Sequence, residues 1–432
     1  MSLSSRALAL VSLIILLAIT GIWVGEPLQG LWRWPAVILL LFIVWERVQT
    51  DKLFSINREI APRLFLGVPA RYQQTIINHS RYPLLLDSQS DYSDSLQADP
   101  KILRWKIPAG ESREKLLKVV PVALGEAALG KTYVRVLGRF GLVWWRHDID
   151  KSVKFQIEPA MLKHNLTITG NTKSGGRNTR LRAGSGFELL NLRDYQHGDP
   201  LHSIDWKASA RRQNTVVRVF SKQQRLEIAI LLDCGRASLI QCGLMSRLHH
   251  YINIASRLTE FAISNEDQVA CIAYADKTIA HMPMSGGISA IQNTRQLLTG
   301  LNTEVEESNP LEIALELKYF LKHRSLVVYL TEMEQAEAAT QLMQAVQLLR
   351  GKHHIVVASI DDPDINNLTQ QIDQTWLSPY QNFAALEYYR GRALTRNKLR
   401  QSGVDVLTAC PENLDAEVLN FYQKIRESRK AM

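Results

Sequence analysis

LRAGSGFELLNLRDYQHGDPLHSIDWKASARRQNTVVRVF, residues 181–220, is the most informative stretch of this chain. It follows neither the period of two of a strand nor the 3.6-residue period of an amphipathic helix. Its glycines permit left-handed backbone, its aspartates and arginines can form bidentate pairs, and its tryptophan offers a large anchor. The stretch is therefore a specific signature. Its distinctive residues are Gly184, Gly186, Glu188, Arg193, Tyr195, Gly198, Asp199, Asp205, Trp206, Arg211, Arg212 and Arg218.

The pattern GxGxE(L/F)xxLRxYxxGD…IDWxxSAR…V closely resembles the signature of the domain of unknown function 58 family. The resemblance implies a membrane-anchored protein with a von Willebrand factor A-like domain and a MoxR-type AAA+ ATPase as partner. It also implies that the polar residues of the signature form a structural network, in which Asp199 and Asp205 receive Arg193, Arg211 or Arg212. The family residues that it assigns are Gly184, Gly186, Glu188, Arg193, Tyr195, Gly198, Asp199, Asp205, Trp206 and Arg211.

Positive charge is concentrated around this signature. The chain of 432 residues has a net charge of +9, and residues 162–225 hold twelve Lys or Arg against four acids. Such a segment can serve an acidic protein partner, an anionic lipid surface or nucleic acid, or it can be a solvated surface. No nucleic-acid-binding motif accompanies the charge, so we expect no nucleic acid partner.

Two apolar segments precede the folded part of the chain. Residues 7–25 are uncharged and long enough to span a bilayer, and residues 28–48 reach a similar length if Arg33 lies at an interface. We therefore predict a transmembrane hairpin over residues 1–50, in preference to a cleaved signal peptide. Basic residues flank both outer ends, which predicts a multi-pass protein of the inner (cytoplasmic) membrane with its soluble domains in the cytoplasm.

Residues 51–160 alternate with the period of a strand and lack long helical patterns, which predicts a small antiparallel β-sandwich. The predicted strands lie at 64–66, 72–78, 102–107, 115–122, 133–137 and 153–157. Residues 161–225 form the basic signature segment that follows this domain. Nothing in the β-sandwich sequence indicates catalytic chemistry.

From residue 226 onward apolar strands alternate with amphipathic helices. The predicted strands lie at 226–233, 269–275, 278–283, 325–330, 354–360 and 404–409. The predicted helices lie near 245–264, 288–300, 310–321, 335–350 and 380–401, with a last one from residue 412. This alternation predicts a doubly wound, mostly parallel sheet over residues 226–432, and the resemblance identifies it as a von Willebrand A-like domain.

A von Willebrand A domain holds a metal ion with a DxSxS motif after its first strand. Here both hydroxyl positions of that motif are lost, to Gly235 and Ala237, while Arg236 adds a positive charge. The oxygen ligands that remain for a magnesium ion are Asp233, Ser238 and Glu332. We expect either a degenerate ion site at these residues or a pocket that binds a partner without metal.

Other catalytic motifs are weak or missing. The acidic and histidine residues of the signature (Asp194, His197, Asp199, His202 and Asp205) lack the spacing of a known metal-ligand frame. No GxSxG elbow and no phosphate-binding loop occurs. The four cysteines Cys234, Cys242, Cys271 and Cys410 lack CxxC spacing, which favours free thiols and a reducing compartment.

The sequence thus predicts a non-enzymatic, membrane-anchored adaptor for a MoxR-type ATPase, with Arg211 and Arg212 as partner-binding residues and with no required cofactor. One alternative is a metal-dependent hydrolase that uses the Asp/His cluster of the signature. Another is a scaffold whose basic segment binds anionic lipid headgroups.

Overall fold

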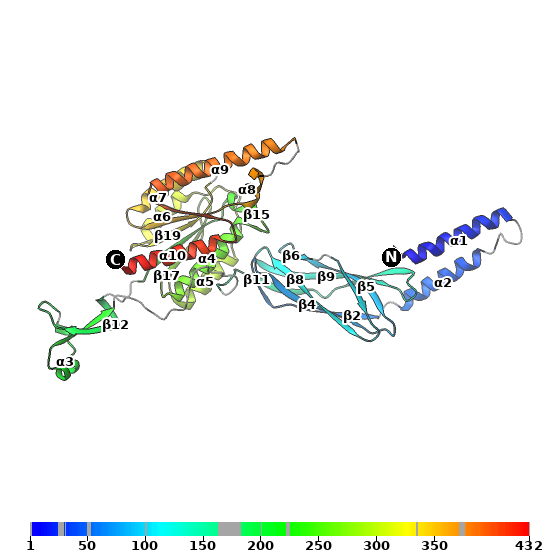
Figure 1. The fold of residues 1–432 in the computed structure, drawn as a ribbon, viewed down its shortest axis with the longest axis horizontal. Helices are drawn as coiled ribbons and strands as arrows, with labels where there is room; N and C mark the ends of the chain where they lie inside the picture. Colours follow the sequence, from blue (N-terminus) through cyan, green and yellow to red (C-terminus); the bar gives the residue numbers. More distant parts are fainter. Residues whose placement is uncertain are drawn as a thin grey trace. The chain divides into compact units, whose positions relative to one another are not determined.

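The structure is a computed structural model that describes residues 2–24, 30, 32–49, 53–99, 102–162, 183–199, 201–221, 225–333, 336–370 and 376–431. The chain divides into two compact units, Met1–Glu158 and Pro159–Met432 (Figure 1). The division lies close to residue 160, where the sequence pattern changes.

Among its described residues, the first unit consists mainly of β-strands, with two α-helices near the N-terminus. The helices are α1 (Ser5–Val24) and α2 (Arg33–Gln49). The strands are β1 (Ser2–Leu3), β2 (Phe54–Glu59), β3 (Arg63–Phe65), β4 (Ala70–Asn78), β5 (Leu84–Tyr92), β6 (Leu96–Asp99), β7 (Leu103–Ile107), β8 (Ser112–Pro121), β9 (Gly125–Leu137), β10 (Val143–Ile149) and β11 (Val153–Glu158).

These strands form two sheets. One sheet has the order β2-β4-β8-β6, and the other contains β1, β10, β9, β11 and β3, with β5 paired to β9 and β7 paired to β5. Strand β7 shows why the sheets pack: in its sequence LRWKI every second side chain is buried. Trp105 at its centre donates from Nε1 to Ser88 Oγ at 2.9 Å, which satisfies the one polar atom of a buried indole.

No helix among the described residues is both long enough and apolar enough to cross a membrane. The prediction of two transmembrane spans, at 7–25 and 28–48, is therefore wrong, and so is the multi-pass inner-membrane localisation that was drawn from it. The end turns of both helices contact the β-strand region. Helix α1 begins beside Ser4, whose hydroxyl donates to Gly141 O at 2.5 Å, and Ala7 is buried against Val143 and Trp145.

Helix α2 also falls short of what a membrane-spanning helix requires. It has 17 residues, which gives a length of about 26 Å against the ~30 Å thickness of a hydrocarbon core. Its last turns carry Glu46, which is buried and accepts a hydrogen bond from Phe140 N at 2.7 Å. The apolar part of the helix is therefore shorter than the helix itself.

The second unit contains a hairpin and an α/β domain. The hairpin consists of β12 (Ala183–Asp194), η3 (Leu201–Ser203), α3 (Trp206–Arg212) and β13 (Val216–Ser221). The remaining strands are β14 (Glu227–Asp233), β15 (Gln241–Cys242), β16 (Met245–Ser246), β17 (Gln268–Tyr274), β18 (Thr278–Ser285), β19 (Leu326–Leu330), β20 (His354–Ile360) and β21 (Asp405–Ala409). The helices are η4 (Arg236–Leu239), α4 (Arg247–Ser264), α5 (Gly287–Thr299), α6 (Pro310–Phe320), α7 (Ala336–Arg350), α8 (Pro363–Gln370), α9 (Ser378–Gln401) and α10 (Leu414–Ala431).

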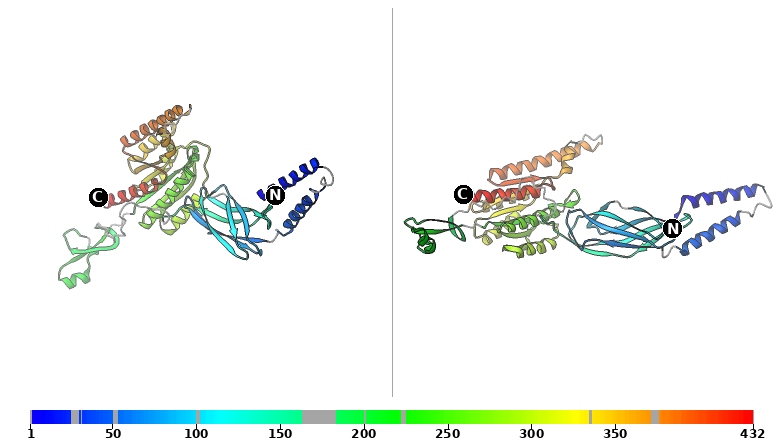
Figure 2. Two further views of the ribbon diagram at one scale, coloured as in Figure 1. Left: turned by 45° about the vertical axis from the view of Figure 1, so that its right-hand side comes forward. Right: turned by 60° about the horizontal axis from the view of Figure 1, so that its bottom comes forward.

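The α/β domain is built on a six-stranded sheet of order β18-β17-β14-β19-β20-β21. All neighbouring pairs are parallel except β17 and β18, which are antiparallel. Strand β14 is buried on both faces, as parallel strands between helices are. Helices lie on both sides of the sheet (Figure 2), with Ala229 and Leu231 packed against side chains of α6 and α7 on one side.

This strand order locates the place where a ligand is expected. Numbered along the chain, the six strands run 3-2-1-4-5-6, so the order reverses between β14 and β19. In open α/β sheets ligands bind outside the carboxyl ends of the strands at such a switch point. Asp233 ends β14, and Thr331 directly follows β19. The fold therefore brings these two residues to the position where a binding site is expected.

The four cysteines are free: Cys410 is exposed, and Cys234, Cys242 and Cys271 are buried. Burial raises the pKa of Cys242 and of Cys271 to about 12, so that both remain protonated thiols near neutral pH. A thiol rather than a thiolate is a poor nucleophile and a poor metal ligand, so these two side chains act as small apolar core residues.

Candidate functional site

The signature residues fold into a hairpin that we call the signature hairpin (residues 183–221). Strands β12 and β13 pair antiparallel, from Asp194 opposite Val216 to Ala183 opposite Ser221. The register shifts between Gly184 and Leu189, where the chain forms a bulge. Gly184 and Gly186 lie in this irregular part of the hairpin. The side chain of Glu188 lies outside the described residues.

The turn of the hairpin is held by an arginine–aspartate pair. Arg193 donates from both terminal nitrogens to the two carboxylate oxygens of Asp199, at 2.8 and 2.7 Å, as the family resemblance implied. Asp199 also accepts from Gln196 N at 2.9 Å, and Gly198 between them has a φ of +105°. The hydrogen bonds from Arg193 and from Gln196 hold the pKa of Asp199 below its usual value. Tyr195 closes the turn by donating its N–H to Thr215 O at 2.8 Å.

Among the residues that the structure describes, Asp205 pairs with no arginine, so that part of the implied network is wrong. Its Oδ1 accepts from Lys207 N at 3.1 Å and from Ala208 N at 3.0 Å, which makes it the N-cap of α3. Ser209 then joins the helix to β13: its hydroxyl donates to Asp205 O at 2.7 Å and accepts from Val216 N at 2.9 Å. The IDWxxS part of the signature therefore builds the short helix.

The outer surface of the signature hairpin combines apolar and basic side chains. Leu201 and Trp206 are 71% and 70% exposed, so Trp206 does not anchor the segment in a core. Arg211 and Arg212 end α3 and are exposed as well. In the part of the chain that the structure describes, neither arginine forms a hydrogen bond or an ion pair. These four side chains are thus available to a partner.

A second candidate site lies at the switch point of the α/β sheet. Asp233 is 2% exposed, and its carboxylate accepts from Thr331 Oγ1 at 2.5 Å, from Gly235 N at 2.9 Å and from Ser308 Oγ. Burial raises the pKa of the Asp233 carboxyl, and the three hydrogen bonds lower it by less. The site is therefore a carboxyl group held by neutral donors from three separate segments.

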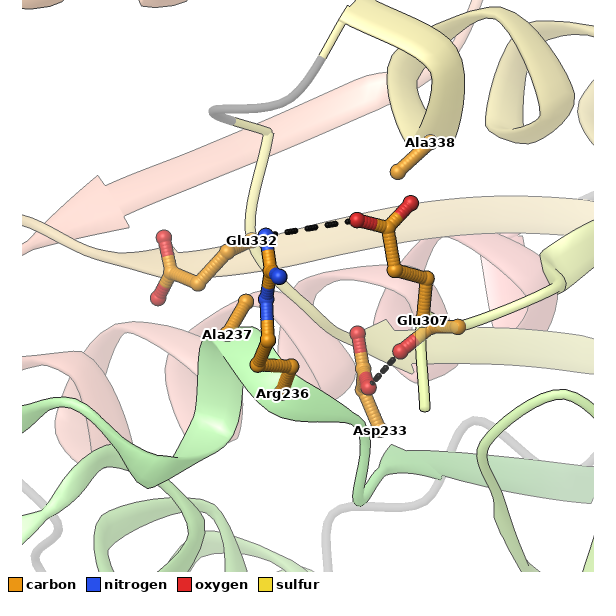
Figure 3. Close-up of a pocket in the computed structure, with 7 residues that line it drawn as sticks. Asp233, Arg236, Ala237, Glu307, Glu332 and Ala338 are labelled. Carbon is orange, nitrogen blue, oxygen red and sulfur yellow. Dashed lines mark hydrogen bonds and ion pairs between the residues drawn. The ribbon is translucent and has the colours of Figure 1, made fainter. Parts of the chain in front are cut away.

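The other predicted metal ligands do not face Asp233. Ser238 is fully buried, and its hydroxyl donates to the backbone oxygen of Asp233 at 2.7 Å. The carboxylate of Glu332 turns away from Asp233 (Figure 3) and accepts from Ser359 Oγ at 2.8 Å and from Tyr251 OH. Arg392 lies 3.7 Å from the same carboxylate. Glu332 is thus neutralised inside a separate buried network.

The residues present do not fit a magnesium ion. Magnesium demands near-octahedral coordination by oxygen, yet Asp233 is the one carboxylate at the pocket whose oxygens meet the hydroxyls of Ser308 and Thr331. Gly235 and Ala237 add no side-chain oxygen. A Cβ at Gly235 would collide with Ser308 Oγ, which fills the space of the lost serine. Among the described residues, no three His, Cys, Asp or Glu side chains form a metal-binding group.

The pocket beside Asp233 is small. It measures about 10 Å³, roughly the volume of one water molecule, and Arg236 and Glu307 form its rim. Their side chains form an ion pair at 3.3 Å (Figure 3). In this state the pocket has no room for a ligand larger than water.

The Asp/His cluster of the signature is dispersed. Asp199 is bonded to Arg193, and Asp205 caps α3, while Asp194 and His197 are exposed. The side chain of His202 lies outside the described residues. The same holds for residues 163–182 and 222–224, which carry much of the predicted basic charge. Among the described residues the geometry does not unite the cluster into one site.

Ser308 and Thr331 were not predicted among the ligands of the ion site. Thr331 could have been found, because it follows a buried strand at the same edge as Asp233. Ser308 gave a weaker signal: it precedes Asn309 and Pro310, which start α6, and 75 residues separate it from Asp233. Only the folded chain shows that its hydroxyl reaches that carboxylate.

Comparison with protein families gives one match. Residues 191–378 match the family model described as "Protein of unknown function DUF58". The match includes most of the signature hairpin, Asp233, Ser308 and Thr331. Among curated proteins none matches this chain.

Solved structures resemble parts of the chain. The conserved hypothetical protein BatB from Bacteroides thetaiotaomicron is 15% identical, with a TM-score of 0.31 over 48% of this chain and 98% of that one. Native alpha-2-macroglobulin of Escherichia coli is 15% identical, with a TM-score of 0.21 over 25% of this chain, which spans only 7% of that protein. A FixG-related protein from Vibrio parahaemolyticus is 8% identical, with a TM-score of 0.19 over 24% of this chain and 97% of its own. TM-scores of this size do not decide the fold.

Replacing Asp205 by alanine should destabilise α3 by about 1 kcal/mol, the usual effect of a lost N-cap. Loss of a buried arginine partner would instead cost roughly 3–5 kcal/mol. Hydrogen exchange at the amides of Lys207 and Ala208 measures the effect directly. The exposed Asp194→Ala variant is the control. A loss of several kcal/mol, accompanied by melting of the α/β domain, would contradict the capping role.

Replacing Asp233 by asparagine should raise the melting temperature near pH 7. Because the folded-state pKa of Asp233 lies above its usual 3.8, folding favours the protonated acid. That contribution is complete below pH 3.8 and is lost as the pH rises through the folded-state pKa. The advantage of the variant should therefore vanish toward pH 3.8, as differential scanning calorimetry can show. The exposed Asp276→Asn variant should show no such gain, and a variant equally destabilised at every pH would refute this account.

Proposed function

The chain belongs to the family described as protein of unknown function DUF58, and from this we propose that it is a non-enzymatic adaptor for a MoxR-type AAA+ ATPase. The signature hairpin is the docking element in this proposal. The adaptor would help the ATPase to assemble or activate protein complexes. The observation that carries the proposal is that the short helix α3 presents an exposed tryptophan at its start and, at its end, two exposed arginines that the hairpin itself does not use.

The signature contains residues that build the hairpin and residues that are exposed on it, and this separation supports a binding role. The residues that build the hairpin are bonded to one another: Arg193 to Asp199, Asp205 to the first turn of α3, and Ser209 to β13. The exposed residues have no such role. A large aromatic side chain and arginines at the surface are the residue types that contribute most binding energy in protein interfaces. The hairpin is thus a framework that presents these side chains.

The charge of the hairpin indicates which kind of partner it fits. Lys207, Arg211 and Arg212 give α3 three positive charges and no negative one. An acidic face on an ATPase would attract this helix, and salt would weaken the association. Trp206 would then supply apolar contact area that salt does not screen.

The same geometry supports a role without catalysis. In the signature, the carboxylate of Asp199 is bonded to an arginine, and Oδ1 of Asp205 accepts from two backbone N–H groups of α3. Groups that act in acid–base catalysis or bind metal are directed at a substrate or an ion. These two carboxylates serve the fold instead.

The docking role can be tested with the purified full chain and the MoxR-type ATPase of the same organism. We expect Trp206→Ala to weaken the complex about 30-fold, which corresponds to roughly 2 kcal/mol for an interface hot spot. Arg211→Glu combined with Arg212→Glu should abolish binding at low salt. Calorimetric titration with and without nucleotide measures both effects.

Lys277→Glu provides the matched control, because Lys277 is exposed in the turn between β17 and β18, away from the hairpin sequence. It should bind like the unchanged protein. Wild-type affinity in the hairpin variants would contradict the docking role. Failure of the folded, unchanged chain to bind the ATPase in any nucleotide state would contradict the adaptor function as a whole.

A further inference from the structure

The segment that precedes α6 is acidic and lies across the switch point of the sheet. We call residues 303–308, with the sequence TEVEES, the acidic strap. Backbone hydrogen bonds fix it to the loop after β14: Glu304 N donates to Cys234 O at 2.8 Å, and Arg236 N donates to Glu306 O at 2.9 Å. Its last residue, Ser308, places its hydroxyl on Asp233. The strap therefore covers the switch point, where the fold favours ligand binding.

The side chains that close the pocket are Arg236 and Glu307. They form an ion pair at 3.3 Å, and they are 57% and 49% exposed. Ion pairs with this much exposure contribute little to stability, because both groups are well hydrated when apart. The backbone of Arg236 is fixed by the strap, while its partner can be exchanged at small cost in free energy. An outside carboxylate could thus take the place of Glu307.

The side chains at this position also differ from those of a metal site. The two hydroxyl positions of the DxSxS motif are absent, and the guanidinium of Arg236 stands at the rim of the pocket instead. A planar guanidinium binds a carboxylate through two parallel hydrogen bonds, and it needs no metal to do so. Glu307 already shows that a carboxylate side chain reaches it (Figure 3).

We propose that Arg236 forms a binding site for an acidic side chain of a protein partner, and that Glu307 occupies this site in the unbound chain. The inference rests on the proposed function, since it adds a second contact at the sheet edge to the docking of the signature hairpin. The ligand is a Glu or Asp side chain on a flexible segment that resembles the acidic strap. Partner binding replaces an internal carboxylate by an external one.

The test uses the full chain and a fluorescein-labelled, C-terminally amidated peptide of sequence TEVEES, followed by fluorescence anisotropy. Because Glu307 competes with the peptide, Glu307→Gln should bind it about two- to fivefold more tightly than the unchanged protein. Arg236→Gln, alone or combined with Glu307→Gln, should remove this gain and bind the peptide more weakly than the unchanged protein. Arg236→Lys keeps the charge but lacks the planar fork, so its affinity should be intermediate.

Glu304→Gln is the matched control, because Glu304 is an exposed acid of the same strap that does not line the pocket. It should bind like the unchanged protein, as should Trp206→Ala, which separates this site from the docking of the hairpin. The melting temperature of each variant verifies its folding. Equal affinities in Glu307→Gln with and without Arg236, no measurable binding by Glu307→Gln, or binding that requires Mg²⁺ would each overturn the proposal.

Discussion

The carboxyl group of Asp233 is buried at the switch point of the sheet, where it meets hydrogen-bond donors from three segments of the α/β domain. Gly235 donates from the turn after β14, Ser308 from the acidic strap, and Thr331 from the end of β19. An isolated buried carboxylate is costly, and these donors offset part of that cost. The interaction requires a glycine at position 235 and hydroxyls at 308 and 331. It also fixes the strap against the loop that carries Arg236.

Glu332, the residue after Thr331, connects other elements of the domain. Glu332 accepts hydrogen bonds from Tyr251 of α4 and from Ser359 of β20, while Arg392 of α9 donates to Ser359 Oγ at 2.6 Å and to Ile360 O at 2.7 Å. Two neighbouring residues after one strand therefore serve different purposes. Thr331 completes the Asp233 site, and Glu332 joins two helices to the sheet. A metal ion could not use Glu332 without breaking this buried network.

Sequence periodicity predicted most of the α/β domain, because regular burial leaves a regular pattern. The strand expected at 226–233 is β14 (Glu227–Asp233), and the helix expected near 380–401 is α9 (Ser378–Gln401). The apolar length of α1 and α2 led to the wrong prediction of two membrane spans. Length alone does not show that Ala7 and Glu46 are buried against the β-sheets. Asp205 was assigned an arginine partner by analogy, although an aspartate before a short helical run is also the mark of an N-cap.

The sites could be predicted less well than the elements, because they depend on contacts between distant residues. Arg193 and Asp199 are six residues apart and meet across one turn, so the family pattern was sufficient. Ser308 is far from Asp233 in sequence, and no local pattern links the two. Glu332 was a reasonable metal ligand by position, but the direction of its side chain is set by Tyr251 and Ser359.

The central claim is that this domain binds at its switch point without a metal, through Asp233 with neutral donors and Arg236 as the fixed positive charge. Calorimetric titration of the full chain with Mg²⁺ at neutral pH tests it most directly, with the melting temperature followed in parallel. We predict no binding heat and no change in melting temperature on adding Mg²⁺ or a chelator. A ligand at 100 times its dissociation constant stabilises a protein by about 2.7 kcal/mol. A rise in melting temperature of that size, reversed by chelator and abolished in Asp233→Ala, would contradict the account.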